Sequence, residues 1–461
     1  MARLCSEPTL PAVTDGAIDR EGECTELLQA LIRNACVNDG TKESGGESRS
    51  ADLLAGVLEG PGLDLETYEA APGRRSLVAR IEGTDPTAPT LLLMGPTDVV
   101  PVNPEHWSRD PFGGELVDGE VWGRGAVDML NLTSSMAVAV RRLARSGFRP
   151  RGTLVYLAVA DEEAVGEWGA DHLLTHERDA VAADYVITES GGIPLPSPAG
   201  LKLPVIVGEK GALWGKLRIG GTAGHGSQPY RTDNALVTAA EVVRRLAEYR
   251  GEPRIHDVWR HFITSMGYPD EITEPLLSTE GFDDMIAGLP IGMARQFHAC
   301  THMTFAPTVI EGGSKINTIP DLVELEVDIR TLPGDDEDAA MAELRLALGD
   351  LADRVDYVPF RYDESSQSPI DTPLWDTLAT VTQRWYPGSE TVPYLTVGAT
   401  DSRFFRRAGS TAYGFGLFSE AMTFEDYGVM FHGDDERIDT ASLGLSTELW
   451  EAVADDLLRR D

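Results

Sequence analysis

The residues of this sequence whose types could do chemistry are acidic, and they follow segments that are predicted to be buried strands. Asp98 comes after the apolar run Leu91 to Met94, and two adjacent glutamates come after the apolar run that ends at Ala160. The carboxyl ends of parallel strands form the edge of a sheet where ligands bind, so we expect these side chains to gather there. The acidic positions concerned are Asp98, Asp128, Glu162, Glu163 and Glu189.

Several carboxylates gathered at one edge need a positive charge between them. Each position alone has a structural explanation, since Asp128 is placed to cap a helix and the glutamate pair is placed in a first helical turn. Together the carboxylates repel one another unless a cation is bound. His432, in the segment FHGDDERI, adds an imidazole. Carboxylate and imidazole ligands together are typical of zinc or a similar divalent ion.

The elements that would position these residues alternate between strands and helices. Thr153 to Ala160 is a nearly continuous apolar run, which is typical of a strand buried on both faces, and Asp184 to Thr188 repeats the pattern after a helical segment. A helix is predicted from Leu130 to Ala144, before Gly147. This order predicts an α/β fold with a largely parallel sheet.

A second domain is predicted inside the first. From about Leu213 the expected order is strand, helix, strand, strand, helix, strand, which is the ferredoxin-like α+β plan. The α/β pattern then resumes, so we expect one domain made of residues 1–212 and 365–461 and an inserted domain at residues 213–364. Residues 252–298 interrupt the inserted unit, and their mixed aromatic and polar composition indicates a mostly helical insertion.

Composition excludes some partners. The chain of 461 residues has 39 Lys and Arg against 75 Asp and Glu, a net charge of −36 that repels nucleic acids and anionic membranes. No run of 18 apolar residues occurs, and none follows the basic residues of the N-terminal segment MARLCSEPTLPAVTDG, so we expect a cytoplasmic protein with no membrane partner. The cysteines lack a CxxC spacing and are expected to be reduced thiols; they are Cys5, Cys24, Cys36 and Cys300.

Over nearly its whole length the sequence resembles the co-catalytic zinc hydrolases that include acetylornithine deacetylase, succinyl-diaminopimelate desuccinylase, aminoacylase and carboxypeptidase G. The motifs that carry the resemblance appear in that family's order and are MGPTDVVPV, WSRDPFGGELVDGEVWGRGAVDM, VADEEAVGEWGA, ITESGG, GHGSQP, GGSKINTIPD, VDIRTLPG, GATDSR and FHGDDERI. The resemblance implies a zinc-peptidase-like α/β catalytic domain with an inserted lid through which two copies form a homodimer. It also implies hydrolysis of an amide bond in small N-acyl amino acids or short peptides.

The resemblance further implies a role for each acidic residue and for His432. Asp128 would bridge two zinc ions, with cobalt or manganese as alternative metals. Glu163 and His432 would complete the ligands of one ion, and Glu189 would bind the other. Glu162 would be the general base, which takes a proton from the attacking water and passes it to the leaving nitrogen.

Other motif residues would bind the substrate. The resemblance assigns Arg330 and Asn317 to the substrate carboxylate, which a guanidinium grips with two parallel hydrogen bonds. It places Gly398 in the wall of the substrate pocket and makes His225 a donor to the oxyanion from the partner subunit. The structural alternatives are a surface ion pair for Arg330 and turn-forming roles for His225 and Asn317.

One residue departs from the family's pattern. In the family Asp98 orients the histidine of a His-x-Asp motif, but position 96 here is proline, which has no side-chain donor atom. The ion between Asp128 and Glu189 therefore loses a ligand, and His106 is interpreted as a surface residue rather than a substitute. Three readings stay open: an active hydrolase with two ions or with the intact site alone, a catalytically impaired relative that binds amino-acid-like ligands, and an ordinary enzyme with one isolated change.

Overall fold

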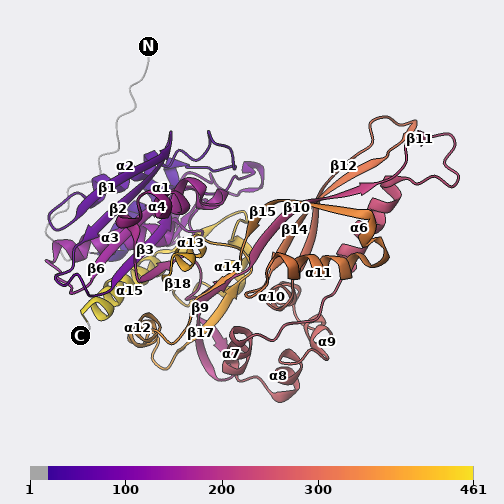
Figure 1. The fold of residues 1–461 in the computed structure, drawn as a ribbon. Coiled ribbons are helices and arrows are strands. Elements are labelled where there is room, and N and C mark those ends of the chain that lie inside the picture. Colours follow the sequence, from indigo (N-terminus) through magenta and orange to yellow (C-terminus); the bar gives the residue numbers. More distant parts are fainter. Residues whose placement is uncertain (1–18, 460–461) are drawn as a thin grey trace, which may run out of the picture.

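Residues 19–459 are described by the structure, which is a computed structural model. The expectations for the N-terminal segment and for Cys5 fall outside these residues. Figure 1 shows two lobes, and β9 (Gly200–Glu209) and β10 (Gly211–Gly220) lead from one to the other. The larger lobe contains both the first helices of the described chain and the last one. The predicted domain boundaries at residues 212 and 364 stay predictions.

The larger lobe is built on a mixed sheet with a parallel centre. Its path is β1-β2-β6-β3-β7-β18-β9-β16, and β8 and β17 also pair with β9. The pairs β6–β3, β3–β7, β7–β18 and β17–β9 are parallel, so the predicted α/β fold is confirmed. The prediction of a largely parallel sheet is wrong, because the hairpins β1–β2 and β8–β9 and the pairs β2–β6, β18–β9 and β16–β9 are antiparallel. The strands not yet given are β1 (Asp64–Ala71), β2 (Arg74–Ile81), β3 (Thr90–Pro96), β6 (Thr153–Val159), β7 (Tyr185–Thr188), β8 (Leu195–Ser197), β16 (Ser366–Gln367), β17 (Glu390–Thr396) and β18 (Thr411–Gly414).

Helices cover both faces of this sheet, because alternate residues of its central strands point to opposite sides. On β3, Leu91 and Leu93 belong to one buried cluster, and Leu92 and Met94 belong to another. The first cluster is covered by α1 (Arg20–Asn34), α2 (Ser48–Leu58), α3 (Leu130–Arg145), α12 (Pro373–Val381) and α15 (Thr440–Arg459). The second is covered by α4 (His172–His176), α5 (Arg178–Val181) and α13 (Ser402–Arg407).

The smaller lobe has the predicted ferredoxin-like plan. Its sheet has the order β12-β14-β10-β15 and is antiparallel throughout. The remaining elements are α6 (Ala235–Glu248), β12 (Thr304–Gly312), β14 (Leu322–Thr331), α11 (Glu337–Leu348) and β15 (Val355–Asp363). Leu213, Leu217 and Ile219 of β10 are buried with apolar residues of both helices, so this lobe has a core of its own.

The interruption of the smaller lobe is helical, as predicted, but it packs on the larger sheet. Its helices are α7 (Asp257–Met266), α8 (Asp270–Leu276), α9 (Phe282–Ala287) and α10 (Ile291–Thr301). Phe262 lies with its ring centroid 4.8 Å from that of Tyr394 on β17. Trp259 and Phe297 share the same buried cluster with Ile206 of β9. The insertion therefore covers the edge of the sheet beside the pocket described below.

Smaller elements connect distant parts of the chain. The strand β19 pairs with β5, which brings the segment after His432 beside the segment before Asp128. These elements are β4 (Glu115–Val117), β5 (Glu120–Trp122), β11 (Gly224–His225), β13 (Thr318–Ile319), α14 (Phe424–Met430), β19 (Arg437–Asp439), η1 (Pro104–His106), η2 (Glu162–Ala164), η3 (Glu167–Asp171), η4 (Gly349–Arg354) and η5 (Thr382–Arg384). None of the helices in residues 19–459 combines the length and apolar character needed to cross a membrane.

Candidate active site

Asp128, Glu163 and His432 converge from three separate segments of the chain. The Nε2 atom of His432 lies 3.0 Å from Oδ2 of Asp128 and 3.3 Å from Oε2 of Glu163. One ligand atom from each of the three lies within 4.8 Å of the others, and no other group of three or more metal-ligating side chains in residues 19–459 does this. Two carboxylates and an imidazole at this spacing fit one divalent ion.

A buried glutamate fixes the loop that carries Asp128. Oε1 of Glu436 accepts hydrogen bonds from the backbone N–H groups of Val127 at 2.6 Å and Asp128 at 2.8 Å. Its Oε2 accepts from the N–H of Gly125 and from the guanidinium of Arg124, both at 2.9 Å. Because Glu436 is fully buried, these hydrogen bonds are shielded from competition with water. The carboxylate of Asp128 is therefore presented on a rigid loop.

The turn after β6 positions Glu163. Asp161, at its start, has a φ of 69°, and its side chain accepts a hydrogen bond from Asn38 Nδ2 at 3.0 Å. The same nitrogen donates to Oδ2 of Asp98 at 2.9 Å, and this oxygen also accepts from the backbone N–H of Glu163 at 3.2 Å. Asp98 thus holds the backbone of a candidate ligand in this chain, where the family pattern has it orienting a histidine.

The electrostatics of the cluster are those of a cation site. Burial is the main cause that raises the pKa of Glu162 to about 7 and the pKa values of Glu163 and Glu189 well above their ordinary range. Repulsion by Asp128 adds to each of these rises. Hydrogen bonding to Asp128, and then to Glu163, raises the pKa of His432 to about 10. Burial and mutual repulsion therefore favour protonation of these carboxyl groups, and a divalent ion bound here would favour release of the protons.

The donors around Glu189 do not complete a second ion site. Glu189 shares a hydrogen bond with Glu162, and its Oε1 has no hydrogen-bond partner among the described residues. Pro96 ends β3 beside this region, and its carbonyl oxygen already accepts from Thr133 Oγ1 at 2.8 Å. The side chain of His106 is 64% exposed, and its Nδ1 lies 3.7 Å from Oδ2 of Asp434. His106 is therefore a surface residue, as expected. No described imidazole replaces the missing ligand.

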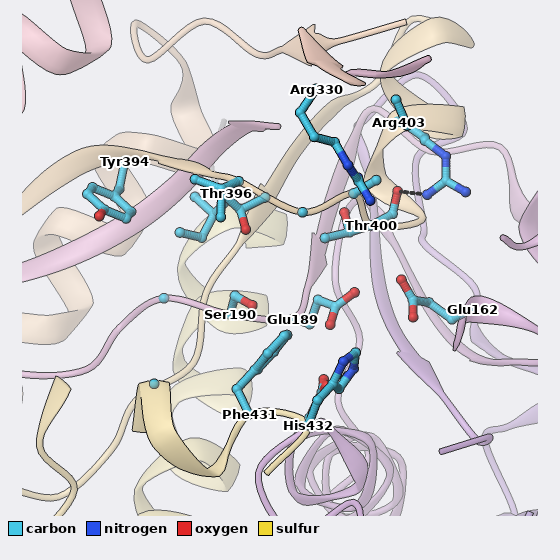
Figure 2. Close-up of a pocket in the computed structure, with 18 of the residues that line it drawn as sticks. Glu162, Glu189, Ser190, Arg330, Tyr394, Thr396, Thr400, Arg403, Phe431 and His432 are labelled. Carbon is cyan, nitrogen blue, oxygen red and sulfur yellow. Dashed lines mark hydrogen bonds and ion pairs between the residues drawn. The ribbon is translucent and has the colours of Figure 1, made fainter. Parts of the chain in front are cut away.

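A cavity of about 450 Å³ opens over these carboxylates. Figure 2 shows Glu162, Glu189 and His432 along its floor with Arg330 above them. Two of the three residues predicted to bind the substrate line this cavity, namely Arg330 from β14 of the smaller lobe and Gly398 from the larger lobe. Asp328 accepts from Nε of Arg330 at 2.8 Å and from Nη2 at 3.2 Å, which fixes the direction of the guanidinium.

Arg403 is a pocket residue that the sequence interpretation missed. It lies in the motif GATDSR, is 3% exposed, and lines the cavity. Its guanidinium donates to the carbonyl oxygens of Thr400 at 2.5 Å and Val165 at 2.7 Å. Its positive charge opposes the rise in the pKa of Glu162. The sequence did contain an indication of this residue, because Arg403 lies within the motif GATDSR. The direction of its side chain, however, depends on a contact with Val165, which is distant in the sequence.

Two predicted residues do not reach the cavity within one chain. His225 lies on β11, which Figure 1 shows at the end of the smaller lobe that is distant from the larger sheet. Its Nδ1 contacts Ser227 Oγ at 2.8 Å. Asn317 lies in the same tip, where its carbonyl oxygen accepts from the N–H of Gly226 at 2.8 Å. Neither His225 nor Asn317 lines the cavity.

The chain is similar to known proteins in sequence and in fold. The profile of peptidase family M20/M25/M40 matches residues 92–456. Aminoacylase-1 of Sus scrofa is 27% identical over 402 residues, which cover 85% of this chain and 87% of that protein. An N-fatty-acyl-amino acid synthase/hydrolase of Xenopus tropicalis is 26% identical over 388 residues, which cover 82% of this chain and 74% of that protein. The crystal structure of an M20 family metallo-carboxypeptidase from Sulfolobus solfataricus has a TM-score of 0.68 at 18% identity, covers 96% of this chain and 100% of its own, and shares the fold.

Proposed function

Because the chain belongs to peptidase family M20/M25/M40, we propose that it is a metal-dependent hydrolase that cleaves the amide bond of small N-acyl amino acids or short peptides. The observation that carries the proposal is the position of Glu162, which lines the cavity together with Asp128, Glu163 and His432. Two relatives, an aminoacylase and an N-fatty-acyl-amino acid synthase/hydrolase, are named for acylated amino acids, which supports this substrate class.

We propose a centre with one ion. Asp128, Glu163 and His432 would hold zinc, with cobalt or manganese as alternatives, and would leave a coordination position open as catalytic zinc sites do. The bound ion would polarise the substrate carbonyl and lower the pKa of a water molecule. Glu189 alone does not make a second site, because Pro96 offers no side-chain donor.

Glu162 would move the proton. A general base works best when its pKa lies near the working pH, and burial raises the pKa of Glu162 toward that range. The carboxylate would take a proton from the attacking water and deliver it to the amide nitrogen as the carbon–nitrogen bond breaks. Arg403, on the same wall, stabilises the ionised form of Glu162 that this role requires.

Arg330 would bind the substrate carboxylate. Its hydrogen bonds to Asp328 use Nε and Nη2. Nη1 has no hydrogen-bond partner among the described residues and is available for a charge-assisted hydrogen bond to a ligand. The ring of Trp214 lies under the guanidinium at 5.7 Å and limits its movement. Arg330 and Glu162 line the same cavity, and Figure 2 shows Arg330 directed toward the carboxylates, which suits a substrate that carries a carboxylate next to its amide bond.

A homodimer would complete the site. His225 and Asn317 lie too far from the cavity to act in their own chain, so we propose that a second copy supplies them. Exposed apolar side chains near this tip support such an interface: Tyr230 is 80% exposed, Val237 is 68% exposed and Ile316 is fully exposed. Burying side chains of this size is favourable. In the dimer His225 would donate to the oxyanion of the reacting carbonyl.

A second candidate function rests on Pro96. If the loss of the expected histidine has abolished turnover, the chain binds amino-acid-like ligands in the same cavity without cleaving them. This candidate uses the pocket and Arg330 but assigns no proton transfer to Glu162.

Hydrolysis of N-acetyl amino acids by the zinc-loaded protein separates the two candidates. We expect release of the free amino acid by the wild-type protein and a loss of at least 100-fold in kcat for Glu162→Gln, since general base catalysis contributes about 10²–10⁴-fold. Glu167→Gln is the matched control, because Glu167 is exposed in the turn that follows. Equal turnover by Glu162→Gln would reject the mechanism, and binding without turnover by the wild-type protein would favour the second candidate.

A further inference from the structure

One part of the cavity has a different character from the part that contains the carboxylates. We define the aromatic compartment as Ile193, Pro204, Ile206, Tyr394, Phe424, Tyr427 and Phe431, all of which line the cavity. Figure 2 shows Tyr394 and Phe431 on one side of Glu189 and Glu162 on the other. The compartment is therefore beside the proposed reacting centre and continuous with it.

The helix α14 forms one wall of this compartment. Phe424, Tyr427 and Phe431 are spaced three and four residues apart, so they lie on one face of the helix and of the turn that follows it. Phe431 stacks on His432 with ring centroids 4.9 Å apart, which fixes one end of the wall against a candidate metal ligand. Phe424 meets Tyr394 edge to face at 6.2 Å, which fixes the other end.

The opposite wall comes from the larger sheet. Ile193 follows β7, and Pro204 and Ile206 belong to β9. Gln296 of α10 also lines the cavity and hydrogen-bonds to Tyr394. The helical insertion therefore contributes a side chain to the cavity beside the compartment.

Part of the aromatic surface of the compartment is not covered by the described residues. Phe424 and Phe431 remain 37% and 38% exposed although they face a cavity. Covering aromatic surface of this kind is favourable, at about 25 cal/mol per Å². No charged side chain belongs to the compartment, whereas Arg330, Arg361, Asp363 and Arg403 line the rest of the cavity. The compartment therefore suits an extended apolar group and disfavours a charged one.

We propose that the aromatic compartment binds a bulky apolar group of the substrate, so that this hydrolase prefers substrates in which a long alkyl or an aromatic group adjoins the scissile amide. This inference rests on the proposed function, because it assigns a specificity to the same cavity. Two parts of an N-acyl amino acid can supply such a group, namely the acyl chain and the amino-acid side chain. Both have the same chemistry, and the test separates them.

The test uses two substrate series with the zinc-loaded full-length protein. In one series the acyl chain on alanine lengthens from acetyl to octanoyl; in the other, N-acetyl is kept while the amino acid changes from alanine to valine, leucine and phenylalanine. We expect kcat/KM to rise by about 3–4-fold per methylene, the factor for burying a CH₂ group, in one of the series. The series that rises identifies which part of the substrate enters the compartment.

Variants show whether the compartment causes this preference. Phe424→Ala should lower kcat/KM for the bulkiest member of that series by about 10-fold more than for the smallest, and Phe424→Leu should restore most of the loss. Val429→Ala is the matched control, since Val429 lies on the same helix, is 71% exposed and does not line the cavity. A flat dependence in both series, or a rise that persists in Phe424→Ala, overturns the inference while leaving the hydrolase intact.

Failure of the proposed function is a separate result. If no compound in either series is cleaved, each compound can be used as a stable ligand. Isothermal titration calorimetry then gives a Kd for each member, and the Kd values are compared along the two series in place of kcat/KM. Tighter binding along one series that Phe424→Ala abolishes supports the compartment. Equal binding of all members overturns it.

Discussion

The Oδ2 atom of Asp98 accepts a hydrogen bond from the backbone N–H of Glu163 at 3.2 Å and another from Asn38 at 2.9 Å. Asp98 is fully buried, and burial raises its pKa well above the ordinary range of an aspartate. The hydrogen bond from Glu163 is a structural role for Asp98 that does not depend on the histidine missing from position 96. It fixes the backbone from which Glu163 projects toward Asp128 and His432.

Replacing Asp98 should therefore weaken the site that remains. We expect Asp98→Ala to lower zinc affinity by about 10–100-fold, the usual effect of losing a group that orients a ligand. Competition with a fluorescent chelator measures this, and Asp110→Ala is a surface control. Unchanged affinity would show that the turn holds Glu163 without Asp98.

Glu436 should be a strong determinant of stability. Glu436→Ala leaves the buried guanidinium of Arg124 without its carboxylate and three backbone N–H groups without their acceptor. Breaking a buried ion pair from one side costs about 3–5 kcal/mol. We expect the free energy of unfolding in urea to fall by this amount, and by about 0.5 kcal/mol or less in the exposed neighbour variant Asp434→Ala. Equal effects of the two variants would contradict this account.

His298 and His302 should make the protein acid-sensitive. Their rings stack at 4.0 Å, and burial lowers the pKa of each to about 4. The unfolded chain protonates its histidines near pH 6.5, so the unfolded state binds more protons and stability falls as pH drops from about 6.5 to about 4.

The double variant His298→Asn/His302→Asn should reduce this loss. We compare the loss of unfolding free energy between pH 7 and pH 5 in the two proteins. For each histidine replaced, we expect the loss in the variant to be smaller than the wild-type loss by on the order of 1 kcal/mol. The matched control is His172→Asn/His176→Asn, a stacked pair nearer the surface. Parallel pH profiles for wild type and the first double variant would contradict the prediction.

Arg330 should discriminate between charged and neutral substrates. Hydrogen bonds to a charged group contribute about 1.5–3 kcal/mol, so Arg330→Met should lower kcat/KM for N-acetyl amino acids by about 10–150-fold, mainly through KM. The loss should largely disappear for the corresponding N-acetyl amino acid amides, which lack the carboxylate. Arg218→Met, on an exposed part of β10, controls for loss of charge. The same loss with acids and amides would remove Arg330 from carboxylate recognition.

The sequence predicted what depends on local pattern. Continuous apolar runs identified the parallel strands, and acids directly after them, such as Glu162 and Glu163, were predicted at the sheet edge where they lie. The ferredoxin-like order was also readable, because each of its elements has its own periodicity. Pro96 was evident as a departure because a motif surrounds it.

Contacts between distant segments were not predictable in this way. Glu436 bonds to residues more than 300 positions away, and nothing in its local sequence distinguishes it from the acids beside it. Asn38 lies in a polar loop, yet it links Asp98 to Asp161. The aromatic face of α14 has helical spacing, but only the fold shows that it borders the cavity rather than a core. Such roles depend on tertiary packing.

The number of zinc ions per chain tests the central claim most directly. In the purified, zinc-equilibrated protein, elemental analysis should give one zinc per chain, and His432→Ala should reduce this count toward zero. Pro96→His, which restores an imidazole beside Glu189, should raise it toward two. Two zinc ions in the wild-type protein, or a count that His432→Ala leaves unchanged, would contradict a one-ion centre held by Asp128, Glu163 and His432.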